Sequence, residues 1–499
     1  MIARLLIAFG IISFFLNAPC WGQNSLLAYR WDGESESALM GYSVSGAGDV
    51  NADGIPDFIV GAKETKAAGV FRSGSAYVFS GIDGSQIYRW DGYYVDQWVG
   101  WSVSGAGDLN LDGHSDLLVC SRTEDVYAYS GQDGSILFQW SQGQQASEAG
   151  DVNNDGHPDV LIARGTTAFV YSGSDGSELY NFSGLSSWPQ GAVDSAGDIN
   201  QDGYADVIIG GDGTATVYSG YDGSILHTFA SGEDDYGKVV SKAGDLNQDG
   251  YPDLLVSAYN ESVGTNIWYN GIVYAYSGLD GSTLYTWNGS STNDQMGYSL
   301  ASAGDVDGDG VNDVLIGCLN AAYQAYSGGR VIAYSGADGT LIENWDGVNS
   351  FARIGVSVSS VGDINLDGRD DVIFGGYLDQ NNSYYNAGSA YVYTIPESPT
   401  MSIVNLVAGE NAILSFAACS PNSNINFAWS TAGGGPLNTS YGVAYISNPF
   451  QVIRVGTNSN GSAQLQPFVP PRLSGVSIWF HGVDLGSATL LNPIATSID

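Results

Sequence analysis

A nine-residue aspartate pattern recurs seven times along the chain. The pattern is D-x-[ND]-x-D-G-x-x-D, and its copies begin at Asp49, Asp108, Asp151, Asp198, Asp245, Asp305 and Asp363. Short acidic side chains at alternate positions can point into one curled loop, and the glycine at position 6 permits the sharp turn. Hard cations such as Ca²⁺ take six to eight oxygen ligands. The pattern therefore predicts a cation-binding loop in every copy.

Each loop offers the side chains of positions 1, 3, 5 and 9 and the main-chain carbonyl of position 7. The predicted ligands are Asp49, Asn51, Asp53, Ile55 and Asp57; Asp108, Asn110, Asp112, His114 and Asp116; Asp151, Asn153, Asp155, His157 and Asp159; Asp198, Asn200, Asp202, Tyr204 and Asp206; Asp245, Asn247, Asp249, Tyr251 and Asp253; Asp305, Asp307, Asp309, Val311 and Asp313; Asp363, Asn365, Asp367, Arg369 and Asp371. We predict up to seven Ca²⁺ ions, which hold turns in place and take no part in a reaction.

An EF-hand or dockerin-type loop is the rival interpretation. Those loops place an acidic or polar ligand at position 12 and continue into a helix. Here position 12 is apolar in every copy, from Val60 in the first to Phe374 in the last. An apolar side chain cannot complete a cation shell, so the aspartate at position 9 must close it. Three or four carboxylates in one turn repel one another unless a cation neutralises them.

The residues around each loop predict the elements that position it. A glycine precedes each first aspartate, and three apolar residues follow each last one, as in 58–60. A second strand signal follows, such as 76–80. The hairpin signal Gly-x-Asp-Gly comes next, at Asp83, Asp133, Asp175, Asp222, Asp280 and Asp338. A fourth segment ends near an aromatic residue. Four antiparallel strands in roughly 50 residues match a β-propeller blade, so we predict a seven-bladed ring.

The two ends of the repeat region predict how the ring closes. The seventh unit stops at Pro396 without a fourth strand, while residues 26–33 precede the first unit and match the fourth-strand text of residues 87–92. We predict that this N-terminal strand completes the seventh blade and removes an open sheet edge. In such a ring, the aspartate loops and the Asp-Gly turns share one face.

Three segments follow from these patterns. Residues 1–22 read as a secretory signal peptide, with Arg4 before the apolar run 5–16, and no later apolar run is long enough to cross a bilayer. Residues 23–396 form the propeller. Residues 397–499 lack the repeat and predict a small β-sandwich-like domain. We expect a secreted protein, extracellular or at the cell surface, with the periplasm as an alternative.

Composition narrows the possible partners. The chain has 15 Lys+Arg against 53 Asp+Glu, a net charge of −38, and it is 43% hydrophobic. The apolar content suits a packed core, and the charge excludes nucleic acids as partners because phosphates are repelled. Apart from Cys20 the thiols are Cys120, Cys318 and Cys419. An odd number at wide spacing is no disulfide framework, so buried thiols are expected at Cys120 and Cys318.

The repeat resembles the FG-GAP repeats of integrin alpha-subunit N-terminal propellers and their bacterial relatives. The matching text is Gly41-Tyr42-Ser43-Val44, then 48–57, then Ile59-Val60-Gly61-Ala62, and similar text covers about residues 24–396. The Phe-Gly start is replaced here by Gly-Tyr or Gly-Trp, and the third unit has only Gly143-Gln144-Gln145. The resemblance implies an extracellular, calcium-loaded interaction platform, and we expect a monomeric propeller. It implies no particular ligand.

Loop lengths indicate where a ligand could bind. The connections between the second and third strands are long in units one, five, six and seven, which become neighbours when the ring closes. Their aromatic residues suit recognition of a protein or a glycan, and the candidates are Trp268, Tyr269, Tyr326, Tyr377, Tyr384 and Tyr385. The plainer interpretation is that these side chains only cover the blades.

Catalytic patterns are not recognised in the sequence. Of the four histidines, His114 and His157 occupy position 7 of a loop, where the carbonyl is the expected ligand and the ring points away. Zinc-ligand spacings, nucleophile elbows and phosphate loops are absent from the sequence. We predict a non-enzymatic binding or adhesion platform. The alternative is an extracellular carbohydrate-active lyase or hydrolase on the same calcium-stabilised propeller, because acidic residues are abundant.

Overall fold

The computed structural model divides into two compact units, Ser25–Ile395 and a second unit that holds the C-terminal residues Pro396–Asp499. The described residues of the first unit are 25–395 without 123–124, 142, 186–191, 232–234, 266 and 381–383. Those of the second are 400–404, 413–417, 424–430, 436–439, 442–445, 451–457, 463–465, 477–484, 489–490 and 494–497. The predicted signal peptide at residues 1–22 and the thiol Cys419 lie outside the described residues.

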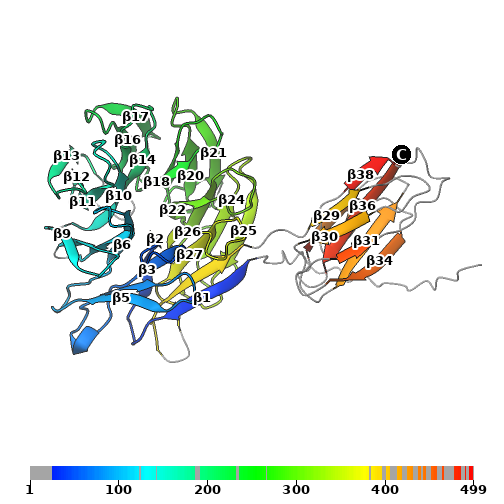
Figure 1. Cartoon of the computed structure of the whole chain (residues 1–499), viewed down its shortest axis with the longest axis horizontal. Helices are drawn as coiled ribbons and strands as arrows, with labels where there is room; N and C mark the ends of the chain where they lie inside the picture. Colours follow the sequence, from blue (N-terminus) through cyan, green and yellow to red (C-terminus); the bar gives the residue numbers. More distant parts are fainter. Residues whose placement is uncertain are drawn as a thin grey trace, which may run out of the picture. The chain divides into compact units, whose positions relative to one another are not determined.

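The first unit consists of seven four-stranded antiparallel sheets arranged as a ring (Figure 1). The blades are β2 (Met40–Gly48), β3 (Asp57–Ala62), β4 (Ser75–Phe79) and β5 (Gln86–Asp91); β6 (Ser102–Gly107), β7 (Asp116–Cys120), β8 (Val126–Tyr129) and β9 (Ile136–Trp140); β10 (Gln145–Gly150), β11 (Asp159–Arg164), β12 (Thr167–Tyr171) and β13 (Glu178–Ser183); β14 (Val193–Gly197), β15 (Asp206–Gly210), β16 (Thr214–Tyr218) and β17 (Ile225–Ala230); β18 (Val239–Gly244), β19 (Asp253–Ala258), β20 (Ile272–Tyr276) and β21 (Thr283–Asn288); β22 (Met296–Gly304), β23 (Asp313–Cys318), β24 (Arg330–Tyr334) and β25 (Leu341–Asp346); β26 (Ile354–Gly362), β27 (Asp371–Gly376) and β28 (Ser389–Thr394) with β1 (Leu26–Asp32).

The innermost strands contact one another in a closed circle, β2–β6–β10–β14–β18–β22–β26 and back to β2. The predicted seven-bladed propeller is therefore confirmed. A short 3₁₀ helix, η1 (Ala67–Gly69), lies in the long loop of the first blade.

The N-terminal strand closes the ring as predicted. Strand β1 pairs antiparallel with β28, from Leu26 opposite Thr394 to Asp32 opposite Ser389. It thereby becomes the fourth strand of the seventh blade. The indole nitrogen of Trp345 in the sixth blade also donates a hydrogen bond to Ser25 Oγ at 2.8 Å. The N-terminal segment is thus joined to the seventh blade through main-chain pairing and to the sixth blade through a side-chain contact.

The hydrophobic core lies between the blades. The second strands are rich in β-branched and leucine residues because both of their faces are covered. Between blades one and two, for example, Ile59 and Val78 pack against Val103 and Leu117. Every blade thus buries its apolar face only against a neighbour, which makes ring closure a condition for the core.

A ring side chain of the fourth strand reaches the Asp-Gly turn of the next blade in six of the seven blades; in the sixth blade Trp345 contacts Ser25 instead, since the seventh blade has no such turn. The Tyr88 hydroxyl donates to Gly131 O at 2.9 Å, and the Trp140 indole donates to Gly176 O at 3.1 Å. Strand β1 makes the same contact, since Trp31 Nε1 donates to Gly84 O at 3.2 Å. The glycine of the turn leaves room for the ring: a Cβ on Gly84 would lie 2.7 Å from the Tyr29 ring.

The described segments of the second unit are β-strands. Its strands β29–β38 form sheets of three, five and two strands. They are β29 (Thr400–Val404), β30 (Ile413–Ala417), β31 (Asn424–Ser430), β32 (Pro436–Thr439), β33 (Gly442–Tyr445), β34 (Gln451–Gly456), β35 (Ala463–Leu465), β36 (Ser477–Asp484), β37 (Thr489–Leu490) and β38 (Ile494–Ser497).

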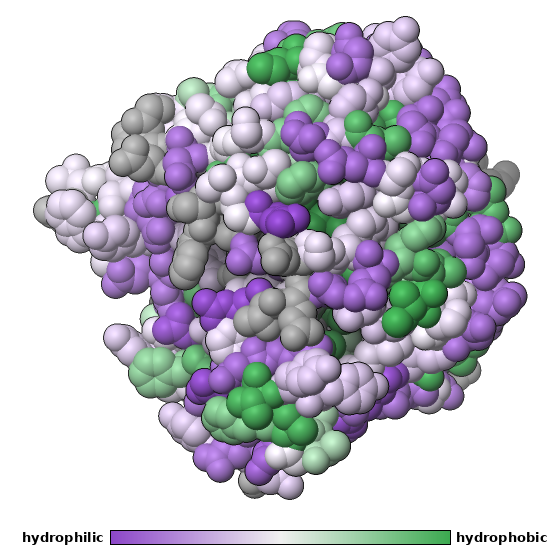
Figure 2. All heavy atoms as spheres, turned by 90° about the vertical axis from the view of Figure 1, so that its left-hand side faces the viewer, coloured by the Kyte–Doolittle hydropathy of each residue, from purple (hydrophilic) through white to green (hydrophobic). Residues whose placement is uncertain are grey.

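The side of the molecule seen in Figure 2 is mainly hydrophilic, and hydrophobic residues form separate patches among polar ones there. Cys120 and Cys318 are buried free thiols, as predicted, and burial raises the pKa of the Cys120 thiol to about 12. Neither thiol is a reactive group.

Candidate functional site

The seven aspartate loops share one backbone conformation. Position 6 is a glycine with φ near +90° in every loop, for example +90° at Gly54. Position 4 is also left-handed, and in six loops it is not a glycine, as at Ala52 (φ 56°) and Leu111 (φ 57°). A non-glycine residue in this region costs about 1 kcal/mol or more, so the surrounding contacts must fix it. The left-handed backbone at positions 4 and 6 curls the loop, and this turns the side chains of positions 1, 3 and 5 inward.

Hydrogen bonds within each loop hold these side chains. In the first loop the amides of Asp53 and Gly54 donate to the two oxygens of Asp49, at 3.0 and 2.8 Å. The Asp53 amide also donates to Asn51 Oδ1 at 2.9 Å. The same three bonds recur in the other loops. Each oxygen keeps a second lone pair for a cation.

The position-9 aspartate joins each loop to the turn before the fourth strand. Asp57 is fully buried, and its Oδ2 accepts the amide of Val50 at 2.9 Å while Oδ1 accepts that of Gly81 at 2.9 Å. All seven copies repeat the pair of bonds. In the last blade the amide of Ile395 replaces the glycine, at 3.3 Å from Asp371 Oδ1. The loops and the Asp-Gly turns therefore share one face, as predicted. The bond to the turn was not predicted.

Burial raises the pKa of these position-9 carboxyls. It is the largest cause at Asp57, whose pKa rises to about 6, and hydrogen bonds from Gly81 and Val50 oppose it. The neighbouring carboxylate of Asp53 adds to the rise. At Asp313 burial raises the pKa to about 7, and Asp307 adds to it. Each loop thus concentrates negative charge that an oxygen-seeking cation would stabilise.

The loop residues fit such a cation. In the sixth loop one carboxylate oxygen each from Asp305, Asp307 and Asp313 lie within 4.8 Å of one another, which brings positions 1, 3 and 9 together. The histidine rings at position 7 point away from their loops as expected: Nδ1 of His114 lies 2.8 Å from Val50 O, and Nδ1 of His157 lies 2.6 Å from Leu109 O. Calcium ligation by the predicted residues stays a prediction.

On the opposite face, four blades share an equivalent hydrogen bond next to an exposed aromatic residue, and we call each of these four positions a corner. In blades one, five, six and seven the carbonyl of an exposed aromatic residue accepts an amide from the connection to the next blade. The pairs are Phe71 with Asp96 (3.2 Å), Trp268 with Asn293 (2.7 Å), Tyr326 with Phe351 (2.9 Å) and Tyr385 with Ser37 (3.0 Å). The residue after each aromatic is left-handed without being a glycine: Arg72, Tyr269, Ser327 and Asn386. These aromatic side chains are 54–68% exposed.

The predicted ligand-face residues are placed in two ways. Trp268, Tyr269, Tyr326, Tyr384 and Tyr385 are exposed on this face. Tyr377 is half-buried instead, because its ring meets that of Tyr42 edge-on, with the centroids 5.5 Å apart.

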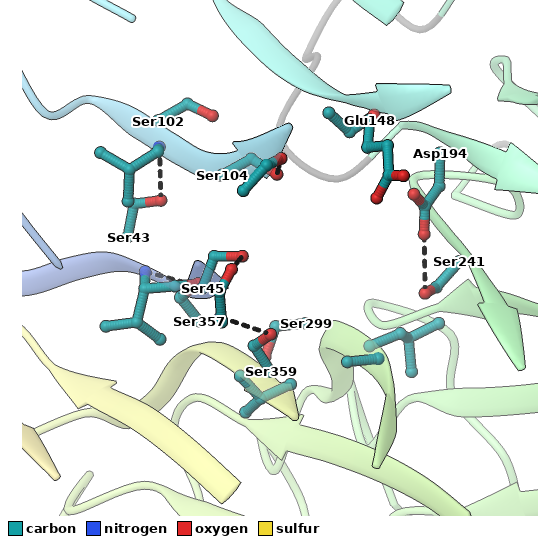
Figure 3. A pocket seen from close by; sticks show the side chains of 18 of the residues that line it. Ser43, Ser45, Ser102, Ser104, Glu148, Asp194, Ser241, Ser299, Ser357 and Ser359 are labelled. Atoms are coloured by element: carbon teal, nitrogen blue, oxygen red, sulfur yellow. Dashed lines mark hydrogen bonds between the residues drawn. The ribbon is translucent and has the colours of Figure 1, made fainter. Parts of the chain in front are cut away.

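A central channel of about 610 Å³ is lined by the first strand of every blade. Its wall is rich in serine (Figure 3), and these hydroxyls join neighbouring strands. The Val103 amide donates to Ser43 Oγ at 3.0 Å, and Ser241 Oγ donates to Asp194 Oδ2 at 3.0 Å. The channel serines therefore contribute to ring assembly.

Sequence reasoning missed a group of aromatic and basic residues at the rim of this channel. Tyr42 and Trp101 line the channel, and Lys63 lies over both rings. The available signal was the scarcity of cations: Lys63 and Arg122 each come one or two residues after a buried second strand of an acidic chain.

Comparisons with known proteins agree with the fold. The FG-GAP-like repeat model matches residues 108–162 and 198–256, and the FG-GAP repeat model matches 40–79 and 240–276. Integrin alpha-5 of Xenopus laevis is 34% identical over 118 residues, which are 22% of this chain and 11% of that protein. Integrin alpha-PS2 of Drosophila melanogaster is 32% identical over 127 residues, 23% of this chain and 9% of that one.

The chain thus spans about a tenth of the length of these curated relatives. Among solved structures, the crystal structure of BBS1N in complex with ARL6DN, soaked with mercury, aligns with 75% of this chain and 97% of that chain, at a TM-score of 0.47 and 10% identity.

Within the part of the chain that the structure describes, no helix has the length and apolar character needed to span a bilayer. The seven repeated loops, the closed ring and the matched repeat models lead to one assignment. This chain is a seven-bladed β-propeller that contains FG-GAP repeats and is a distant homologue of the integrin alpha subunits.

Proposed function

We propose that the protein is a secreted, calcium-stabilised propeller that binds a protein or glycan ligand without catalysing a reaction. Ca²⁺ ions occupy the aspartate loops and keep the blades in register. The opposite face, with the long loops of blades one, five, six and seven, contacts the ligand.

The calcium part is supported by the fit of the loops. Each loop places three or four carboxylates around one turn, and its position-9 aspartate is buried with a raised pKa. Bound Ca²⁺ would supply positive charge to this oxygen cluster. Positions 1, 3 and 5 are already directed inward by main-chain hydrogen bonds, so ordering the loop around an ion costs little further entropy.

The set of four equivalent corners is the observation that carries the binding role. An aromatic side chain stands exposed at the same place in four neighbouring blades, on a backbone that keeps non-glycine residues left-handed. Strained backbone gathers at functional sites more often than elsewhere. Large, rigid aromatic side chains are also the residues that contribute most to recognition surfaces.

The enzyme alternative has weaker support. Of the two acids that Figure 3 labels in the channel, Asp194 accepts hydrogen bonds from Ser241 Oγ and from the amides of Ser195 and Lys242. That carboxylate thereby joins blades four and five. The sequence similarity to integrin alpha subunits over about a fifth of the chain favours a binding role. It also favours an extracellular location.

Arrays of glycans and of extracellular proteins, probed with the calcium-loaded full chain, test this proposal. We expect at least one ligand that is bound and released unchanged. The variant with Phe71, Trp268, Tyr326 and Tyr385 all replaced by alanine should lose at least tenfold in affinity and keep its melting temperature, since the corner bonds are main-chain bonds. Tyr221→Ala is the control, because Tyr221 is exposed at an Asp-Gly turn instead. Equal binding by the fourfold variant, or turnover of the ligand, would contradict the proposal.

A further inference from the structure

Four aromatic side chains touch at the rim of the channel, on the face opposite the aspartate loops. The Tyr42 ring lies 5.2 Å from Trp101 and 5.5 Å from Tyr377, and Trp98 stacks on Trp101 at 5.9 Å, centroid to centroid. They come from blades seven, one and two and from the connection between blades one and two. We call these four residues, Tyr42, Trp98, Trp101 and Tyr377, the aromatic collar. All four are half-buried.

Two cations lie on the collar. Lys63 Nζ is 3.2 Å from the centroid of Tyr42 and 4.3 Å from that of Trp101. The Arg122 guanidinium is 4.4 Å from Trp98 and 5.1 Å from Trp101. One indole ring thus has two positive groups close to it. Cation–π contacts attract a cation more weakly than a carboxylate partner would, so they do not replace a full counter-ion.

Neither cation has a carboxylate partner among the described residues. Five other basic residues, Arg30, Arg72, Arg89, Lys238 and Arg330, form ion pairs. The acid next in sequence to Lys63 is Glu64, whose Oε2 lies 3.2 Å from Arg72 Nε and is therefore engaged elsewhere. Lys63 and the exposed Arg122 thus place two positive groups on one indole ring without a carboxylate partner among the described residues.

Further donors at the collar are unsatisfied. The indole nitrogen of Trp98 is buried and has no hydrogen-bond partner, and the same holds for Nε of Arg353, whose side chain hydrogen-bonds Tyr377. A buried donor without an acceptor destabilises the fold, because it has lost its hydrogen bonds to water. Donors and cations thus surround the collar in excess of acceptors.

Lys63 is held at a cost to stability. Burial lowers its pKa to about 7; Glu64 opposes this shift, and the positive charge of Arg122 adds to it. An anion that enters between the two cations would offset the repulsion by Arg122 and stabilise the charged form of Lys63. Titratable groups whose pKa is strongly shifted, and whose charge does not stabilise the fold, are common at binding sites.

We propose that the aromatic collar binds a single carboxylate of a protein partner, from an Asp or Glu side chain or a chain terminus. The carboxylate lies between Lys63 and Arg122, and its apolar stem packs against Tyr42 and Trp101. This inference rests on the proposed binding role of the face, but it uses none of the four corner aromatics.

Charge decides between an isolated carboxylate and a polyanion. The molecule carries a net charge of −38, so an acidic polysaccharide with a charge on every ring is repelled by most of the surface. The collar is a small positive region within an acidic surface. A single carboxylate can bind there, whereas further charges on a polyanion would approach acidic residues and be repelled. A protein loop can present one isolated carboxylate.

The test selects random twelve-residue peptides displayed on phage against the calcium-loaded full chain. We expect the enriched peptides to share an acidic residue. Synthetic versions should bind at least tenfold more weakly when that residue becomes its amide, or when the protein carries Lys63→Gln with Arg122→Gln. A matched control, Lys66→Gln with Arg164→Gln, removes two cations away from the collar and should bind as the wild type does.

The pH dependence gives a second measurement. Binding favours charged Lys63, so affinity should fall as the pH rises from 7 to 9, through the lowered pKa of the free protein. Peptides amidated at the C-terminus separate the two sources of the carboxylate. If amidation alone abolishes binding, the ligand is a chain terminus.

Three results would overturn the inference: no enrichment over the Lys63→Gln, Arg122→Gln variant, enriched peptides without an acid, or equal competition by polygalacturonate. The melting temperature of the variant shows that it folds. If the fourfold corner variant still binds the acidic peptide, the collar acts independently and the inference stands. The inference alone fails under the following result: the corner variant loses the ligand found on the array, the collar variant keeps it, and no acidic peptide binds. The proposed binding role would then still stand.

Discussion

At the scale of single residues, the position-9 aspartate is the most demanding side chain of the fold. It is predicted to be a calcium ligand, and its two oxygens also accept main-chain amides from two different turns, as Asp253 does from Leu246 and Gly278. It thus connects the cation loop to the turn before the fourth strand within one blade. Its loss leaves two buried amide donors without acceptors.

Asp253→Asn tests this connection. The amide group can accept only one of the two bonds, and its own N–H faces a second donor, so we expect a loss of about 2–4 kcal/mol and a melting temperature several degrees lower. Asp280→Asn, in the exposed hairpin turn of the same blade, should change it little. Equal melting of the two variants would show that the buried bonds contribute little.

Lys63 predicts a pH-dependent stability. Its pKa in the folded protein is about 7, below the usual value of 10.5, so its charge opposes folding fully below pH 7 and progressively less as the pH rises to 10.5. Lys63→Met should therefore raise the melting temperature by about 2 °C at pH 6 and much less at pH 10. Lys66→Met, three residues away and exposed, is the control. A gain that is independent of pH would contradict the cause given.

At the scale of elements, the blades hold one another through repeated contacts between neighbours. The fourth strands of blades one to five each send a ring side chain to the Asp-Gly turn of the next blade, and strand β1 does the same for the first blade. Trp31 of β1 also stacks on Phe79, with the centroids 4.4 Å apart. The N-terminal segment is therefore a structural part of two blades.

Deletion of residues 23–33 should abolish the cooperative thermal transition or lower it by more than about 10 °C, since it exposes the edge of β28 and part of two interblade cores. A synthetic peptide of residues 23–33 should restore part of the loss. An unchanged melting curve of the deleted protein would contradict the role of β1 in closure.

Repetition explains which elements could be predicted. Ligand spacing, glycines and apolar runs recur together, so the blades, the loops and the closing strand were readable from the sequence. The left-handed residues Arg72 and Tyr269 were not, because neither residue type favours that conformation and only the paired loops impose it. The collar was also hidden, since Tyr42 and Trp101 meet only after neighbouring blades pack. Tyr377 was a candidate for the ligand face, and the same packing half-buries it.

At the scale of the whole molecule, charge and topology act together. The propeller can bury its apolar faces only as a complete ring, yet the chain carries a net charge of −38, and three or four carboxylates gather in each aspartate loop. Self-repulsion of this size weakens a compact state. Calcium in the loops would reduce the net charge while fixing one turn in every blade, so one ion type serves both requirements.

The most direct test of this account is a calorimetric calcium titration of the full chain after removal of bound metal with a chelator. Close to seven ions should bind per chain, and the melting temperature should rise with calcium concentration because the ion binds only the folded state. A titration without binding heat, together with a melting temperature that ignores both calcium and chelator, would contradict the central claim.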